Sequence, residues 1–115
     1  MLVAYSVDRQ GPDSLLDGRF GRCPFFALVD EEHDQVEFVA NSGVDAAIGA
    51  GTGAAQQLLD REVAAVVTGQ VGPKAFEILA AADIPVFLAP AGLSLAAARE
   101  RQRAGRLQRY QIQRF

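Results

Sequence analysis

The stretch "VAAVVTGQVGPKAFEILAAADIPVFLA", residues 63–89, decides the fold because it contains a strand, a helix and a second strand in turn. Residues 63–68 and 84–89 are short apolar runs, which is typical of buried strands. Between them, Pro73 stands in the first turn of a helix, where proline is favoured, and apolar residues recur at helical spacing from Phe76 onward. Because a right-handed crossover joins parallel strands, the stretch predicts one β-α-β unit of an α/β sheet.

The flanking sequence completes this sheet. Three further strands are expected upstream, at residues 2–7, 25–30 and 35–40. The last of them alternates apolar and polar side chains, so we expect it to be half-exposed and antiparallel to its predecessor. One helix is expected within residues 51–61, and another runs from the N-cap Ser94 to Gly105. The order β-β-β-α-β-α-β-α predicts a single α/β domain with a mixed five-stranded sheet flanked by helices.

The composition sets limits on the class of protein. The chain has 115 residues, half of them apolar and 22% charged, as in one ordinary globular domain. We assign residues 1–105 to this domain and residues 106–115 to a basic C-terminal extension. A single cysteine and a single histidine exclude an internal disulfide and a closed zinc site within one chain. With no membrane-length apolar run and no basic start typical of a secretory signal, we expect a cytoplasmic protein.

The net charge of −3 is unevenly distributed. Residues 1–95 hold five basic against thirteen acidic side chains, whereas residues 96–115 hold six arginines against Glu100 alone. The acidic body would repel nucleic acid, and no aromatic stacking platform accompanies the basic end, so nucleic-acid binding is not expected. The basic end is either a solvated helix face with an extension or a surface that docks an acidic partner.

Glycines precede the first predicted helix in "GAGTGAAQQLL", residues 49–59. Exposed N–H groups and the dipole at such a helix start favour an anion, and the candidate ligand-binding residues are Gly49, Gly51, Thr52 and Gly53. The stretch does not follow directly on a strand and lacks the later acidic residue of a dinucleotide site, and no Gly-Lys-Ser/Thr follows to make a P-loop. Tight helix packing without any ligand is the alternative.

A second glycine turn, "TGQVGPKAF" at residues 68–76, has the same strand-turn-helix form and adds Gly69 and Gly72 as candidates. Both helices begin after strands, where α/β proteins place ligands, so we expect the two turns to converge on one crevice. Lys74 either adds a positive charge there or is a solvated surface lysine.

The only cysteine lies in "RFGRC", residues 19–23. Arg19 and Arg22 are expected to lower the pKa of the Cys23 thiol and to increase its thiolate fraction. Catalysis is not expected, because His33 lies roughly 20 Å away along the intervening strand. Cys23 is thus either a loose ligand beside the arginines or a small packed residue.

Several aspartates invite a two-metal nuclease interpretation, namely Asp8, Asp13, Asp17, Asp30 and Asp45. We do not favour it, because they lie in turns or at strand ends rather than pointing inward from strands.

Three motifs, in this order and spacing, resemble one known family: "FGRCPFF" (20–26), "GAGTGAAQ" (49–56) and "TGQVGPKA" (68–75). Over residues 2–105 the chain resembles the dinitrogenase iron–molybdenum cofactor biosynthesis family, with its NifX-like and NifB C-terminal-like domains. The resemblance implies a ribonuclease-H-like fold without nuclease activity. It also implies a small non-enzymatic accessory or carrier protein, which binds an iron–sulfur or iron–molybdenum cofactor or precursor and passes it to a protein partner.

One position departs from the family pattern. Members often carry a histidine just before the glycine loop, where this chain has Ile48. Cluster binding would then depend on Cys23 as the metal ligand, on the N–H groups of the two glycine turns, and on Arg19 or Arg22. Since stable iron–sulfur ligation uses about four protein ligands, a single thiolate would hold a cluster transiently. The alternative function is an adaptor with a vestigial anion site that docks a partner through its basic C-terminus.

Overall fold

The structure is a computed structural model, and it describes residues 1–46 and 49–111. The predicted order of elements is confirmed, with one short strand added at the end. The elements are β1 (Leu2–Val7), β2 (Phe25–Asp30), β3 (Gln35–Ala40), α1 (Ala50–Asp60), β4 (Ala65–Thr68), α2 (Pro73–Ala81), β5 (Val86–Leu88), α3 (Leu95–Arg103) and β6 (Gln108–Arg109).

All strands belong to one mixed sheet with the order β3-β2-β1-β4-β5-β6. The central strand β1 pairs antiparallel with β2 and parallel with β4, so that Tyr5 stands opposite Ala27 on one side and Val67 on the other. Strands β4 and β5 are parallel and are joined through α2, which confirms the β-α-β unit predicted from residues 63–89.

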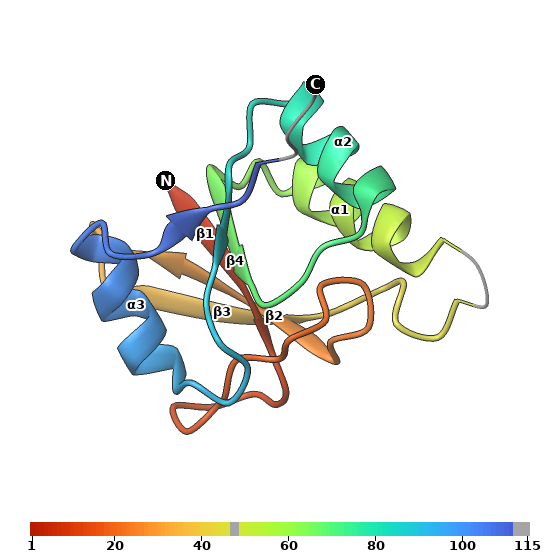
Figure 1. Ribbon diagram of the computed structural model, residues 1–115. Coiled ribbons are helices and arrows are strands. Elements are labelled where there is room, and N and C mark those ends of the chain that lie inside the picture. Colours follow the sequence, from red (N-terminus) through yellow and green to blue (C-terminus); the bar gives the residue numbers. More distant parts are fainter. Residues whose placement is uncertain (47–48, 112–115) are drawn as a thin grey trace.

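Helices cover both faces of the sheet. Figure 1 shows α1 and α2 on one side and α3 on the other. The side under α1 and α2 holds a core that includes Leu58 and Leu79, and the side under α3 holds a second core that includes Tyr5 and Leu95. The apolar side chains on both faces of the central strands are therefore removed from water. The nearly continuous apolar sequences of these strands predict this burial.

One additional strand and the lengths of two strands differ from the prediction. The sheet has six strands rather than five, because β6 pairs antiparallel with β5. The predicted strands 63–68 and 84–89 are shorter, and they form ladders only over Ala65–Thr68 and Val86–Leu88. Pro85 directly precedes β5. It has no N–H to donate to the neighbouring strand, although its carbonyl accepts from Val66 N–H at 3.0 Å.

The described part of the basic C-terminal region, residues 96–111, lies against the body of the molecule. Arg99 contacts the carboxylates of Glu31 and Asp34, and Arg103 contacts Glu31 at 3.3 Å. Beyond β6, the Tyr110 ring packs edge-on against Phe76, with ring centroids 4.9 Å apart. Part of the positive charge of α3 is thus matched by the acidic turn between β2 and β3. No helix in the described residues is long and apolar enough to cross a membrane.

Candidate anion-binding site

Helix α1 begins without a side-chain cap. Its N-cap residue, Gly49, adopts a left-handed conformation with φ of 81°, which glycine accommodates without strain. The first intrahelical bond runs from Gly53 N–H to Gly49 O, at 2.9 Å. The N–H groups of Ala50, Gly51 and Thr52 therefore have no acceptor within the helix, as is general for a first turn.

Helix α2 begins in the same way. Its N-cap residue, Gly72, is extended and gives no side-chain cap, and Pro73 occupies the first helical position. Phe76 N–H donates to Gly72 O at 3.0 Å, which leaves the N–H groups of Lys74 and Ala75 without an intrahelical acceptor.

The two helix starts face one surface hollow of about 430 Å³, which we call the glycine hollow. It is lined by Gly21, Arg22, Gly49, Ala50, Gly51, Thr52, Gly72, Pro73, Lys74 and Ala75. The expected convergence of the two glycine turns is therefore present. Each helix N-terminus carries about half a positive charge, so the two fields add in this hollow.

Two cationic side chains border the hollow. Arg22 is exposed, and its Nη1 donates to Val44 O at 3.0 Å and to Ala46 O at 2.7 Å. Lys74 is exposed and makes no ion pair within the described residues. None of the described residues that line the hollow is acidic. Its chemistry therefore favours a compact anion held by backbone N–H groups and flanking cations.

Close backbone packing sets the shape of the hollow. A Cβ on Gly21 would lie 2.7 Å from Gly51 N, so the loop that carries Arg22 touches the first turn of α1 directly. A Cβ on Gly51 would lie 3.4 Å from Ala75 Cβ, so the two helix starts are also near neighbours. The absence of side chains at Gly21 and Gly51 lets these three backbone segments approach so closely.

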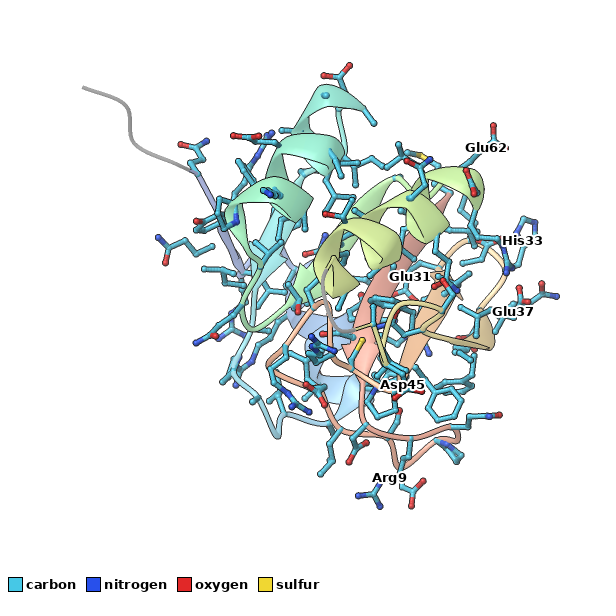
Figure 2. All side chains as sticks on the ribbon, turned by 90° about the vertical axis from the view of Figure 1, so that its right-hand side faces the viewer. Arg9, Glu31, His33, Glu37, Asp45 and Glu62 are labelled. Atoms are coloured by element: carbon cyan, nitrogen blue, oxygen red, sulfur yellow. The ribbon has the colours of Figure 1, made fainter. Side chains whose placement is uncertain are left out.

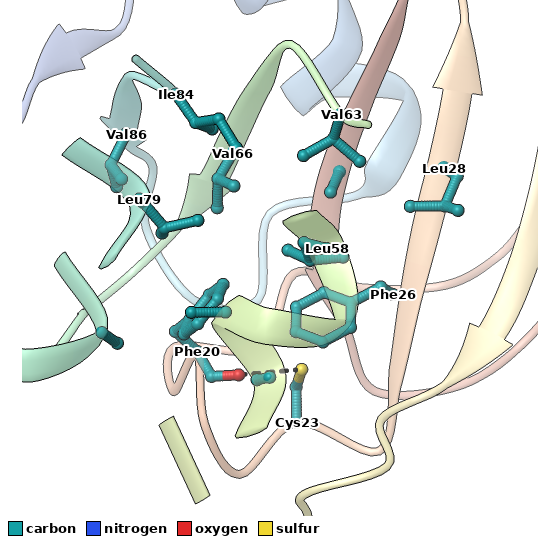
Figure 3. Packing of buried hydrophobic residues seen from close by; sticks show 14 residues of the cluster. Phe20, Cys23, Phe26, Leu28, Leu58, Val63, Val66, Leu79, Ile84 and Val86 are labelled. Atoms are coloured by element: carbon teal, nitrogen blue, oxygen red, sulfur yellow. Dashed lines mark hydrogen bonds between the residues drawn. The ribbon is translucent and has the colours of Figure 1, made fainter. Parts of the chain in front are cut away.

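Cys23 does not line the glycine hollow. Its side chain is fully buried in the core under α1, beside Phe20 and Phe26, and Sγ donates to Phe20 O at 3.4 Å. Figure 3 shows this thiol among apolar side chains. Burial, aided by the negative charge of Asp17, raises the pKa of Cys23 to about 12. The predicted lowering of this pKa is therefore wrong.

The arginines fail to activate the thiol because both are directed elsewhere. Arg19 pairs with Asp17, with Nε 3.4 Å from Oδ1, and Arg22 donates to the carbonyls of Val44 and Ala46. Proximity in the sequence did not predict the side-chain directions.

Besides Cys23, three of the expected ligand-binding residues lie outside the glycine hollow. Arg19 and Gly69 line a separate, smaller hollow of about 260 Å³ at the carboxyl ends of β4 and β5. Phe20 stands between Arg19 of this hollow and Gly21 of the glycine hollow in the sequence; its N–H donates to Gln70 O at 3.0 Å and its ring is buried. Gly53 lies further along α1 and is not among the lining residues. The sequence candidates are thus divided between two surfaces.

The remaining titratable residues are dispersed. His33 follows β2 and pairs with Asp30 at 2.8 Å, at the opposite end of that strand from Cys23. In Figure 2 it points outward at the rim of the molecule. Residues 1–46 and 49–111 contain no group of three or more His, Cys, Asp or Glu side chains that could share a metal ion.

Comparison with known proteins places the chain in a family. The sequence profile of the family described as dinitrogenase iron–molybdenum cofactor matches residues 1–105. The chain belongs to this family. Membership indicates involvement in the biosynthesis or binding of iron–molybdenum cofactor. The helix starts that line the glycine hollow all lie within the matched residues.

Two solved structures share the fold of this chain, and a third protein is similar to it in sequence. The apo form of the orange protein from Desulfovibrio gigas is 36% identical, with a TM-score of 0.90 over 95% of this chain and 92% of that one. A candidate NifB protein from Thermotoga is 30% identical, with a TM-score of 0.83 over 98% and 97% of the two chains. An uncharacterised protein of Methanocaldococcus jannaschii is 28% identical over 77% of this chain and 75% of its own length.

Two residues, Ile48 and Asn41, complete the comparison with the sequence. Ile48, where the resemblance led us to expect a histidine, lies outside the described residues. The sequence motifs do not include Asn41, although its buried amide contacts the loop that carries Arg22 and Cys23. An asparagine that directly follows a strand is ordinary turn chemistry, so the sequence holds no stronger signal for it.

Proposed function

We propose that this protein is a non-enzymatic carrier that holds an anionic metallocluster, or a precursor of one, in the glycine hollow and transfers it to a protein partner. The cargo class is an iron–sulfur or iron–molybdenum species, in keeping with the family. The observation that carries the proposal is the convergence of two uncapped helix starts on one hollow bordered by Arg22 and Lys74. The residues we assign to binding are Arg22, Gly49, Gly51, Thr52, Gly72 and Lys74.

The cargo in this proposal is held without a bond to the Cys23 sulfur. The thiol is fully buried in the core and does not line the hollow, so it cannot reach a cluster there unless Cys23 leaves the core. Backbone N–H groups and cations can hold a preformed anionic cluster and can also release it. This reversibility suits transfer to a partner better than a full set of thiolate bonds. We place this role in the cytoplasm, where a lone thiol stays reduced.

Anaerobic loading tests the proposal. The protein is incubated with ferrous iron, sulfide and molybdate, desalted, and analysed for retained metal, sulfide and visible absorption. We expect the wild type and Cys23→Ala to retain cargo, and the double variant Arg22→Ala/Lys74→Ala to lose most of it. Arg101→Ala is the matched control, because Arg101 is an exposed cation on α3, on the other side of the sheet.

Two outcomes would contradict the proposal. Retention of cargo by the double variant would move the site away from the glycine hollow. Loss of cargo in Cys23→Ala alone would show that the thiol is the ligand after all, and that Cys23 leaves the core when cargo binds.

A further inference from the structure

One buried polar side chain lies directly behind the glycine hollow. Asn41 follows β3, is 2% exposed and is the only asparagine of the chain. Its Nδ2 donates to Gly21 O at 3.1 Å and to Cys23 O at 3.0 Å, and its Oδ1 accepts from Gly43 N–H at 3.0 Å. Both ends of the amide are therefore used, as burial of a polar group requires.

The two segments that Asn41 holds both rest on the first turn of α1. A Cβ on Gly21 would lie 2.7 Å from Gly51 N, and a Cβ on Gly43 would lie 2.7 Å from Ala50 O. The backbone at each glycine thus touches the helix start with no room for a side chain. One amide links two glycine segments that enclose the same helical turn.

We infer that Asn41 is the positioning residue of the anion site. It does not line the hollow itself. Through Gly21 it fixes the loop that carries Arg22, and through Gly43 it fixes the chain that leads into α1. Asn41 therefore helps to set the distance between the Arg22 cation and the N–H groups of α1, together with the contacts of Arg22 to Val44 O and Ala46 O. The inference rests on the proposed function, since it concerns the same hollow.

The chemistry of the position favours an amide in particular. The contacts need two hydrogen-bond donors at one end and an acceptor at the other, within a buried space. A carboxylate of the same shape would direct a negatively charged oxygen at the carbonyls of Gly21 and Cys23. Its negative charge would also repel an anion bound in the hollow. An alanine would leave two carbonyl groups and one N–H without their present partner.

The test uses sulfate as the probe anion and compares the wild type with Asn41→Asp, Asn41→Ala and Val29→Ala. Val29 is fully buried in the core under α3, so its truncation destabilises the fold without touching the hollow. Sulfate is titrated while the backbone amide signals of Gly21, Gly43 and Gly51 are followed by ¹⁵N NMR. We expect sulfate to bind about ten-fold or more weakly to both Asn41 variants, through the loss of buried hydrogen bonds. Val29→Ala should keep the wild-type affinity.

The same spectra test the contacts without any anion. We expect the three glycine amide signals to shift in ligand-free Asn41→Asp and to stay in place in Val29→Ala. In the wild type, selective labelling of asparagine gives a single side-chain amide pair, because Asn41 is the only asparagine. Its protons should exchange with solvent far more slowly than those of an exposed amide. This last measurement needs no variant to fold.

The outcomes separate the two proposals. If the wild type binds sulfate and the Asn41 variants bind it equally well, or Val29→Ala loses as much affinity, the positioning role is overturned while the anion site stands. If the wild type binds no sulfate, the anion site fails and its positioning residue fails with it. Fast exchange of the Asn41 amide, or unshifted glycine signals in Asn41→Asp, overturns the link to the helix turn itself.

Discussion

Replacement of Gly21 by alanine is the sharpest perturbation of the glycine hollow. The added Cβ would lie 2.7 Å from Gly51 N, 2.8 Å from Gly51 Cα and 3.2 Å from the carbonyl carbon of Ala50. All three are backbone atoms of a helical turn, so no side chain can rotate away. To reach the 3.4 Å of an ordinary contact, the loop and the helix start must move apart.

The cost of this separation can be estimated from overpacked cores. Forcing one methyl group into a tight contact costs about 1–3 kcal/mol, and each kcal/mol lowers the melting temperature of a domain of this size by roughly 4 °C. The same movement shifts Arg22 relative to the N–H groups of α1. Because a hydrogen bond to a charged group contributes about 1.5–3 kcal/mol, we expect sulfate or cluster affinity to fall by about ten-fold or more.

Thermal unfolding by circular dichroism and anion titration by NMR measure the two effects, with Gly53→Ala as the matched control. The nearest atom to a Cβ on Gly53 is Gly43 Cα at 3.6 Å, an ordinary contact. Gly53 lies inside α1, where alanine is favoured over glycine by roughly 0.5–1 kcal/mol, so the control should gain stability and keep its affinity. A Gly21→Ala protein as stable as the wild type would refute the contact. One that is less stable but binds anions normally would refute the part that the loop plays in the site.

Three further predictions follow from particular contacts. Arg22→Lys should weaken anion binding by several-fold at least. Arg22 makes both carbonyl contacts through Nη1 and has two further nitrogens in its guanidinium group, whereas lysine has only one nitrogen for the carbonyls and the anion. Isothermal titration measures this loss of affinity. Folding raises the pKa of Cys23 from its ordinary 9.0 to about 12, so the folded state holds this proton more tightly. Its contribution to stability should be constant below pH 9 and should decline as the pH rises toward 12. Urea unfolding of Cys23→Ala should show a weaker alkaline loss than the wild type, and native Cys23 should resist alkylation at pH 8. Tyr110→Ala should lower the free energy of unfolding by about 1 kcal/mol or more, because the ring loses its edge-on contact with Phe76, and equal stability in urea would contradict this.

The sequence predicts most of the fold because the elements signal themselves locally. The strand and helix of residues 63–81 follow from apolar periodicity and from Pro73, and the two-sided burial of β1 follows from its unbroken apolar run. The strand β6 escapes such reasoning. It has two exposed residues, and it is held in place by the flanking Leu107 and Tyr110, which pack on opposite faces of the sheet. Such a strand depends on tertiary contacts that periodicity does not encode.

The site is predicted less completely, for a physical reason. Glycines mark where backbones approach or helices begin, but they do not tell which of these occurs. Gly72 begins α2 and lines the glycine hollow, whereas Gly69, three residues earlier, is required because a Cβ there would lie 2.7 Å from Gly18 Cα. Likewise, "RFGRC" predicts charge beside a thiol, but the turn directs Arg22 outward and Cys23 into the core.

A site made of backbone N–H groups changes what selects the cargo. A thiolate or imidazole site recognises a metal through its ligand preference, whereas the glycine hollow offers positive potential, donors and a fixed shape. Any compact anion of suitable size meets the same groups, so selectivity must come from geometry. At Gly21 and Gly43 the backbone touches the first turn of α1 so closely that no side chain would fit. The Asn41 side chain is hydrogen-bonded to both glycines. For a carrier, this arrangement separates affinity from covalent ligation. In the transfer proposed above, the partner would supply the metal ligands, because the one thiol of this chain is buried.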